Sequence, residues 1–198
     1  MACFARNRRS KQTSRNKHPK TKIIFAHSAG PQYARGKGSY DLVKYLKSKL
    51  PEEFQILFPI IKKPNSPTHD KFKKMFKVAF AKITEPVIVV GHSLGGSTLL
   101  KYLSEEKPGV SILGLFLVST PHWKSNMREF QLKENFQTSL KDIPKIFLYH
   151  SKEDADVPIA SLTFYENAFK TAVVHKLNGN EHTFSKGLPE LVADIKSL

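Results

Sequence analysis

Apolar residues in this chain gather in short runs that alternate with longer segments of helical spacing. The runs predict strands at residues 23–26, 54–61, 87–90, 112–118, 146–149 and 173–177. Most lack a regular alternation of polar and apolar positions, which is typical of parallel strands buried on both faces. Apolar side chains at positions i, i+3, i+4 and i+7 predict helices over residues 41–50, 70–83, 94–103 and 188–198.

Strands that alternate with helices indicate an α/β fold with a doubly wound, mostly parallel sheet and right-handed crossovers. In such a sheet, ligands bind at the carboxyl ends of the strands. The length of 198 residues suits one domain, which we expect over residues 21–198. Between Trp123 and Lys145 there is room for one short helix but none for a large cap domain.

The net charge of +15 is concentrated near the N-terminus, where residues 1–22 hold eight lysines and arginines and no acidic residue. This composition predicts that residues 1–20 form a disordered basic tail. The tail is either a solvated extension, a weak contact for an anionic partner such as nucleic acid or a membrane surface, a nuclear address, or an organelle transit peptide. Lysines on the 70–83 helix indicate a solvated outer face or a contact with an acidic partner.

Cys3 is the only cysteine, so the chain forms no internal disulfide and is compatible with a reducing compartment. No apolar stretch is long enough to span a bilayer, and the N-terminus lacks the apolar core of a secretory signal. We therefore expect a cytoplasmic protein, or a nuclear one if the basic tail acts as an address. No His/Cys/Asp cluster has the spacing of metal ligands, so no metal or organic cofactor is expected.

The sequence Gly91-His92-Ser93-Leu94-Gly95 is a G-x-S-x-G motif between a predicted strand and a predicted helix. This context is that of a nucleophile elbow, in which a serine is exposed on a strained strand-to-helix turn. Gly91 and Gly95 would provide the clearance that the close packing of the turn requires. The motif predicts Ser93 as a nucleophile for acyl transfer.

Two later turns carry the residues that such a serine needs. Asp154 and Asp156 follow the predicted strand at 146–149, and both are candidate acids. A carboxylate there can fix the tautomer of a catalytic imidazole. His182 lies on a Gly/Asn-rich loop after the last predicted strand, from which it can reach back to Ser93.

An oxyanion hole is predicted from the N–H of Leu94 and from the small-residue loop after the first strand, with Ser28 or Ala29 as the second donor. His27 ends that strand and could be taken for a base or a pocket residue, although a structural role is favoured. His122 and Trp123 follow the 112–118 strand, where they either line the substrate pocket or cover the core.

The chain order Ser93, Asp154, His182 resembles that of the α/β-hydrolase superfamily. On this resemblance Asp154, three residues before Val157-Pro158, is preferred to Asp156 as the acid. The absence of a cap and the ending His182-Thr-Phe184 before a short helix are similar to the small serine hydrolases related to retinoblastoma-binding protein 9. The first loop departs from the common His-Gly pair because it reads His27-Ser28. The resemblance implies a hydrolase acting on small esters, thioesters or amides. The alternative is a non-catalytic protein of this fold that binds a protein or nucleic acid through its basic surface.

Overall fold

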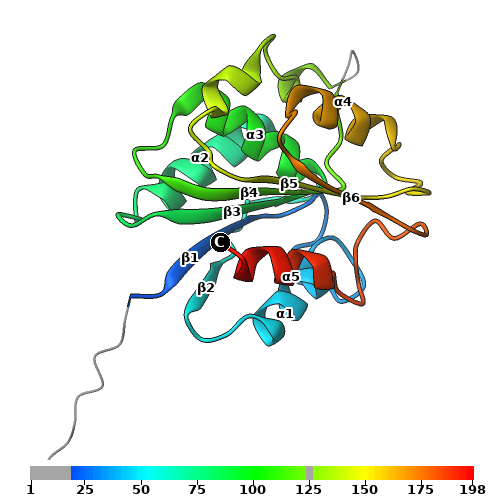
Figure 1. Cartoon of the computed structure of the whole chain (residues 1–198), viewed down its shortest axis with the longest axis horizontal. Coiled ribbons are helices and arrows are strands. Elements are labelled where there is room, and N and C mark those ends of the chain that lie inside the picture. The colour runs from blue at the N-terminus through cyan, green and yellow to red at the C-terminus, as the bar shows by residue number, and fades with distance from the viewer. Residues whose placement is uncertain (1–18, 124–126) are drawn as a thin grey trace, which may run out of the picture.

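A computed structural model of the chain describes residues 19–123 and 127–198 (Figure 1). The predicted disorder of the basic tail falls on residues 1–18, which lie outside this range. The elements, in chain order, are β1 (Thr21–Ala26), α1 (Tyr40–Lys49), β2 (Phe54–Leu57), α2 (His69–Phe80), β3 (Val87–His92), α3 (Leu94–Glu106), β4 (Ile112–Val118), the 3-10 helices η1 (Arg128–Phe130) and η2 (Phe136–Leu140), β5 (Ile146–Ser151), α4 (Ala160–Ala168), β6 (Val173–Leu177) and α5 (Pro189–Lys196).

The strands form one six-stranded sheet in the order β2-β1-β3-β4-β5-β6. Every pair of neighbouring strands is parallel. Helices α2, α3 and α4 cover one face of the sheet, and α1 and α5 cover the other (Figure 1). The predicted doubly wound parallel sheet is therefore confirmed.

Each face of the sheet has its own core. Val87 and Val89 of β3 pack on the side of α2 and α3, whereas Ile88 and Val90 pack on the side of α1 and α5. All four side chains are completely buried. The run of β-branched residues without polar positions thus arises because both faces of this central strand are covered.

Three details differ from the sequence prediction. Strand β2 ends at Leu57, well before residue 61, because its pairing with β1 ends at the Ile24–Leu57 pair and Pro59 follows. Helix α4 was not predicted. In place of one short helix, the described part of the 123–145 segment holds η1 and η2.

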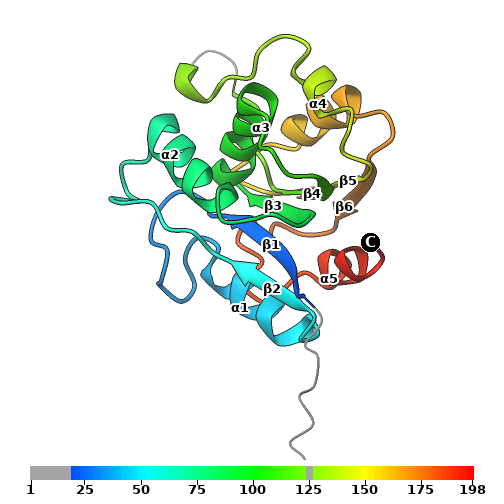
Figure 2. The ribbon, with the colours of Figure 1, turned by 90° about the vertical axis from the view of Figure 1, so that its left-hand side faces the viewer.

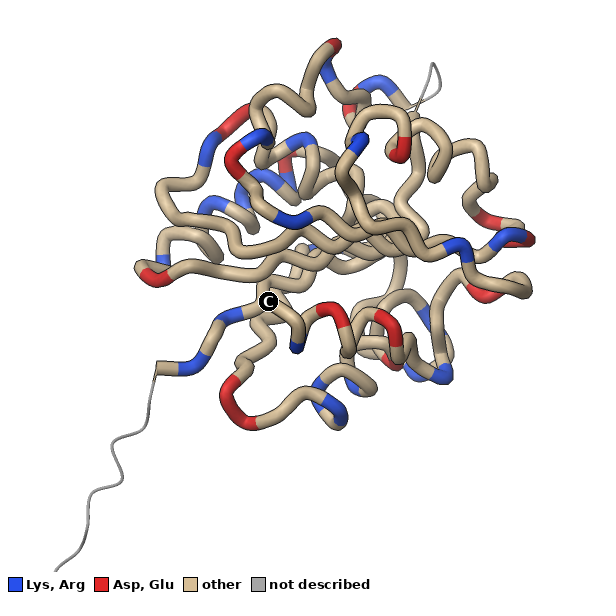
Figure 3. The backbone as a smooth tube through the Cα atoms, viewed as in Figure 1, with Lys and Arg blue, Asp and Glu red and all other residues tan. Residues whose placement is uncertain are grey.

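Basic residues lie on both helical layers (Figure 3). Several of those on α2 are paired: Lys73 and Lys77 both contact Glu106, and Lys74 contacts Asp70. Within residues 19–123 and 127–198, no helix has the length and apolar character needed to cross a membrane.

Candidate active site

Ser93 occupies a sharp turn between β3 and α3. Its backbone has a φ of 52° and a ψ of −128°, a conformation that residues other than glycine rarely adopt. The Ser93 N–H donates to the carbonyl of Val118 at 2.8 Å, which ties the turn to the end of the neighbouring strand β4. The predicted elbow geometry is therefore present.

The two glycines of the motif are required by close packing. A Cβ atom at Gly95 would lie 2.2 Å from the carbonyl oxygen of Ala26, and one at Gly91 would lie 2.5 Å from Cα of Gly96. Both distances are shorter than any real carbon contact, so a larger residue would push the turn away from β1 or from its own helix. The elbow consequently packs directly against the end of β1.

The imidazole of His182 lies between the Ser93 hydroxyl and the Asp154 carboxylate. Its Nε2 atom is 3.0 Å from Ser93 Oγ, and its Nδ1 atom is 2.8 Å from Asp154 Oδ2 and 3.1 Å from Oδ1. A carboxylate accepts hydrogen bonds, so Nδ1 carries the proton and donates it. Nε2 then presents a lone pair to the serine hydroxyl, which is the arrangement that a general base needs.

Asp154 is held as an anion by its turn. Its Oδ1 atom accepts the N–H of Asp156 at 3.0 Å and the N–H of Val157 at 2.9 Å. Desolvation of the buried carboxylate opposes ionisation, but the hydrogen bonds from His182 and the Val157 N–H outweigh it and lower the pKa of Asp154. Asp156 is exposed and contributes only its backbone to this turn. Of the two candidate acids, the structure brings Asp154 to the imidazole.

The loop after β1 distinguishes between the two candidate oxyanion donors. The Ser28 N–H already donates to Ser39 Oγ at 3.0 Å, and Ser28 is buried. Ala29 is exposed, and within the described residues neither its N–H nor that of Leu94, at the first position of α3, has a hydrogen-bond acceptor. Of the three predicted donors, Leu94 and Ala29 therefore keep an N–H without an acceptor, whereas the N–H of Ser28 is used by Ser39.

His92, the second residue of the motif, has a structural role that the sequence did not reveal. Its Nε2 atom lies 2.8 Å from the carbonyl oxygen of His182, and its Nδ1 atom lies 2.8 Å from Ser39 Oγ. The carbonyl can only accept, so Nε2 donates to it and Nδ1 accepts from the Ser39 hydroxyl. Complete burial, and then the nearby His182, lower the pKa of His92 to about 3, so the ring stays neutral.

This histidine therefore joins three parts of the site. Through Ser39 it is linked to the Ser28 N–H in the loop after β1, and through the His182 carbonyl it is linked to the loop that carries the candidate base. Its place inside the G-x-S-x-G motif was visible in the sequence. Its two partners were not, because they lie 53 and 90 residues away.

The predicted pocket residues separate into two groups. His27 is completely buried, its Nδ1–H donates to the Ser28 carbonyl, and its ring packs against Phe58 with centroids 5.1 Å apart. Burial also lowers the pKa of His27. This side chain therefore supports the loop from within, and its assignment to the pocket is wrong.

His122 does line a cavity. The cavity has a volume of about 510 Å³, and its lining combines Phe136 and Phe164 with polar residues such as Glu134. None of Ser93, Asp154 and His182 lines it, so a place for His122 in the substrate pocket stays a prediction. The His122 ring stacks on Phe164 with 3.4 Å between centroids, and its backbone N–H donates to Ser161 Oγ at 3.1 Å. Trp123 packs toward Phe130 with ring centroids 6.2 Å apart and is not among the residues that line this cavity.

One group in the described residues has ligand atoms close enough for a metal ion. The side chains of Asp154, Asp156 and His182 offer ligand atoms within 4.8 Å of one another. Both ring nitrogens of His182 are, however, already engaged, one with Asp154 and the other with Ser93. The arrangement is therefore suited to proton transfer.

Most of the chain matches a known protein family. The family model described as serine hydrolase matches residues 43–183. A search of curated protein sequences finds no match.

Three solved structures share the fold. The ydeN gene product from B. subtilis is 16% identical with a TM-score of 0.67, over 91% of this chain and 98% of that one. The monoacylglycerol lipase of Paleococcus ferrophilus is 15% identical with a TM-score of 0.59, over 90% and 95%. An esterase domain from Rhodothermus marinus is 16% identical with a TM-score of 0.61, over 91% and 84%. These similarities establish the α/β-hydrolase fold, with no cap domain in the described residues.

Proposed function

The chain belongs to the serine hydrolase family, and on that premise we propose that it cleaves carboxylic esters, thioesters or amides of small molecules through Ser93, His182 and Asp154. One observation carries the proposal: the His182 imidazole bridges the serine hydroxyl and the buried carboxylate at hydrogen-bonding distance on both sides. We also propose that, within this family, the chain is one of the small serine hydrolases similar to retinoblastoma-binding protein 9.

In the first half of the reaction, Ser93 Oγ attacks the substrate carbonyl carbon while His182 Nε2 removes the hydroxyl proton. The carbonyl π electrons move to oxygen, and the N–H groups of Leu94 and Ala29 stabilise the resulting oxyanion. When the tetrahedral intermediate collapses, His182 gives its proton to the leaving group. A covalent acyl-serine then remains.

In the second half, a water molecule replaces the leaving group. His182 Nε2 removes a proton from this water as the oxygen attacks the acyl carbon, and it returns the proton to Ser93 Oγ as the acid departs. The Asp154 carboxylate stabilises the imidazolium that forms in both halves. The low pKa of Asp154 keeps this negative charge present at neutral pH.

A preference for small substrates is part of the proposal. With no cap domain in the described residues, the site stays open and offers little enclosed surface to a long acyl chain. We expect a preference for short acyl chains, to be measured with p-nitrophenyl esters of graded chain length.

Covalent labelling tests the proposal directly. A fluorophosphonate probe should label the full chain but not a Ser93→Ala variant, because the probe reacts only with an activated serine. Asp154→Asn should reduce kcat by roughly 10³- to 10⁴-fold, since the amide favours the wrong tautomer of His182. Asp156→Asn, an exposed control two residues away, should retain activity.

Two results would contradict the proposal. Failure of the folded wild-type chain to react with the probe would favour a non-catalytic protein that uses this fold for binding. Loss of activity in Asp156→Asn with retention in Asp154→Asn would reverse the assignment of the acid.

A further inference from the structure

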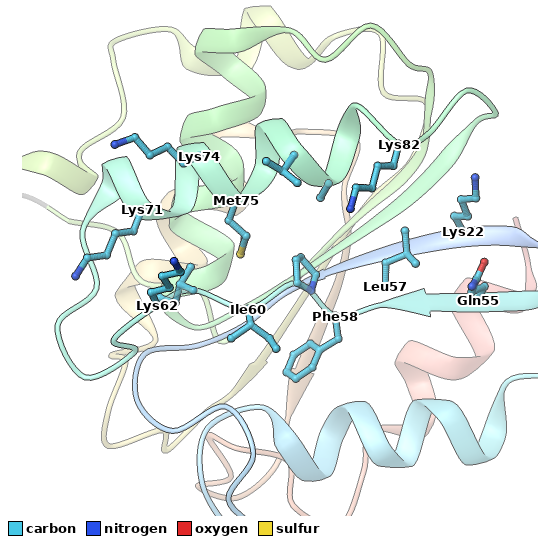
Figure 4. A pocket seen from close by; sticks show the side chains of 14 residues that line it. Lys22, Gln55, Leu57, Phe58, Ile60, Lys62, Lys71, Lys74, Met75 and Lys82 are labelled. Carbon is cyan, nitrogen blue, oxygen red and sulfur yellow. The ribbon is translucent and has the colours of Figure 1, made fainter.

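A groove runs between helix α2 and the edge of the sheet formed by β2. Its volume is about 770 Å³, which is larger than that of the cavity beside His122. Figure 4 shows α2 along its upper side, and β2 with the segment that follows it along the lower side. Figure 2 shows the same edge of the molecule from outside. None of Ser93, Asp154 and His182 lines this groove.

The groove surface is mainly apolar and open to solvent. Ile60 is 50% exposed and Val78 is 58% exposed, which makes them two of the few large hydrophobic side chains exposed in the described residues. Leu57 and Met75 lie beside them in the groove. Contiguous exposed apolar surface of this kind is characteristic of binding sites, whereas single exposed apolar residues are not.

Charge around the groove has one sign. The lining residues include five lysines and no acidic residue. Two of these lysines are paired, Lys22 with Glu85 and Lys74 with Asp70. Within the part of the chain that the structure describes, Lys62, Lys71 and Lys82 form no ion pair.

The pairing pattern on α2 is informative because the helix carries lysines on two sides. Lys73 and Lys77 point to Glu106 on α3 and are neutralised there. Lys71 in the first turn of α2 and Lys82, two residues beyond its end, line the groove. Lys71 Nζ donates to the Ser66 carbonyl, and neither lysine has a carboxylate partner among the described residues. The uncompensated positive charge at the two ends of this helix therefore faces the apolar groove.

Charge disfavours two occupants that belong to this protein. In a symmetric dimer that buries the groove of both copies, the same lysines would face one another, and like charges at such a contact are repulsive. The N-terminal residues 1–18 have only basic charged residues in their sequence, so they meet the same repulsion.

Addition of a peptide strand to β2 is also disfavoured. The edge strand has only four residues and is flanked by lysines, which are features that protect sheet edges from pairing. Protection of the edge would account for the lysines. It would not account for the apolar residues that line the groove between them, such as Leu57 and Met75. An apolar floor beside unpaired lysines is instead complementary to a small molecule that is both apolar and anionic.

We infer that this groove binds an amphiphilic carboxylate, the anion of a fatty acid such as dodecanoate. The acyl chain lies on Leu57, Ile60, Met75 and Val78, and the carboxylate lies between Lys62 and Lys71 at one end of the groove (Figure 4). A volume of about 770 Å³ is within the range of small-molecule sites, which are mostly apolar with a few polar groups. The site is independent of the proposed hydrolysis at Ser93.

The methionines of the chain provide a direct test. There are three: Met1, Met75 and Met127. Met75 lines the groove, whereas Met127 packs at the edge of the core near η1. The full chain is labelled with ¹³C at the methionine methyl groups and titrated with dodecanoate below its critical micelle concentration. We expect a saturable shift of the Met75 signal and none of the Met127 signal.

Changes in the ligand head group and in the lysines of the groove separate the contribution of charge from that of the apolar chain. Dodecyltrimethylammonium, which has the same chain and the opposite charge, should bind at least about tenfold more weakly. Lys62→Glu with Lys71→Glu should weaken dodecanoate binding by about tenfold or more. The matched control, Lys44→Glu with Lys47→Glu, makes the same charge change at exposed positions of α1 and should leave binding unchanged.

Several results would overturn the inference. They are a Met75 signal that does not move, equal binding of the two head groups, or equal weakening by the two double variants. Binding of phosphatidylserine vesicles without binding of monomeric dodecanoate would assign the surface to a membrane instead. A shift confined to Met127 would indicate binding away from the groove, and because no arm measures hydrolysis, failure here leaves the proposed function standing.

Discussion

Replacing His92 with phenylalanine would remove two hydrogen bonds that join the loops of the site while keeping a ring in the same buried space. The His182 carbonyl would lose its donor, and the Ser39 hydroxyl would keep only Ser28 Oγ, at 3.2 Å, as an acceptor. A net hydrogen bond is worth about 1 kcal/mol, and a buried polar group left unpaired costs roughly 1–3 kcal/mol. We therefore expect the free energy of unfolding to fall by roughly 2–4 kcal/mol.

The effect on catalysis should be larger than the effect on binding. The His182 carbonyl belongs to the residue that must stay 3.0 Å from Ser93 Oγ, and misplacement by about 1 Å can cost roughly 10²-fold in rate. We expect kcat to fall by about that factor, with a small change in KM, since His92 is completely buried and so cannot contact a bound substrate. Hydrolysis of p-nitrophenyl acetate and urea unfolding measure the two effects.

Two further variants complete this experiment. His92→Gln restores a donor for the His182 carbonyl and should recover part of kcat, which a purely steric role would not predict. His69→Phe changes a histidine at the start of α2, outside the site, and should have no effect on kcat. If a folded His92→Phe variant keeps kcat within about threefold of wild type, the positioning role of His92 is refuted.

Other changes test separate parts of the argument. Gly95→Ala should prevent accumulation of folded protein, because its Cβ would lie 2.2 Å from the Ala26 carbonyl oxygen, whereas Gly109→Ala meets no atom within 4 Å and should change the midpoint of thermal unfolding little. Ala29→Pro removes the proposed oxyanion N–H and should reduce kcat by roughly 10²- to 10³-fold without unfolding the chain; unchanged kcat would exclude that donor. Burial lowers the pKa of His92 to about 3, so between about pH 6.5 and 3 the unfolded chain binds a proton that the folded chain does not. The free energy of unfolding should therefore decrease as the pH falls through this window, by up to roughly 1.4 kcal/mol per pH unit from this residue, and less steeply in His92→Gln; equal slopes in urea titrations would contradict this.

Strands and the elbow could be predicted from local sequence because their determinants are local. The residues of β3 are apolar because both faces of that strand are covered, and Gly91 and Gly95 are needed for contacts at one turn. The position of His182 followed from topology, since a loop after the last strand of a parallel sheet returns to the edge where Ser93 lies. These inferences required no knowledge of side-chain contacts.

The remaining features depend on contacts between distant segments. Helix α4 was missed because Thr163, Phe164 and Tyr165 favour strands, and its buried side includes the polar Ser161. The network of His92 and the use of the Ser28 N–H by Ser39 could not be predicted, because they join loops that only the folded sheet brings together.

The all-parallel sheet also sets the order in which this protein can become active. Each neighbouring strand pair is separated by a crossover, so its contacts are distant in sequence and folding is expected to be slow for a chain of this size. During synthesis, β3 can join β1 and β4 while the chain that will carry the base is still unmade. A chain that stops before residue 182 would lack the proposed base, so Ser93 would have no imidazole at 3.0 Å to accept its proton.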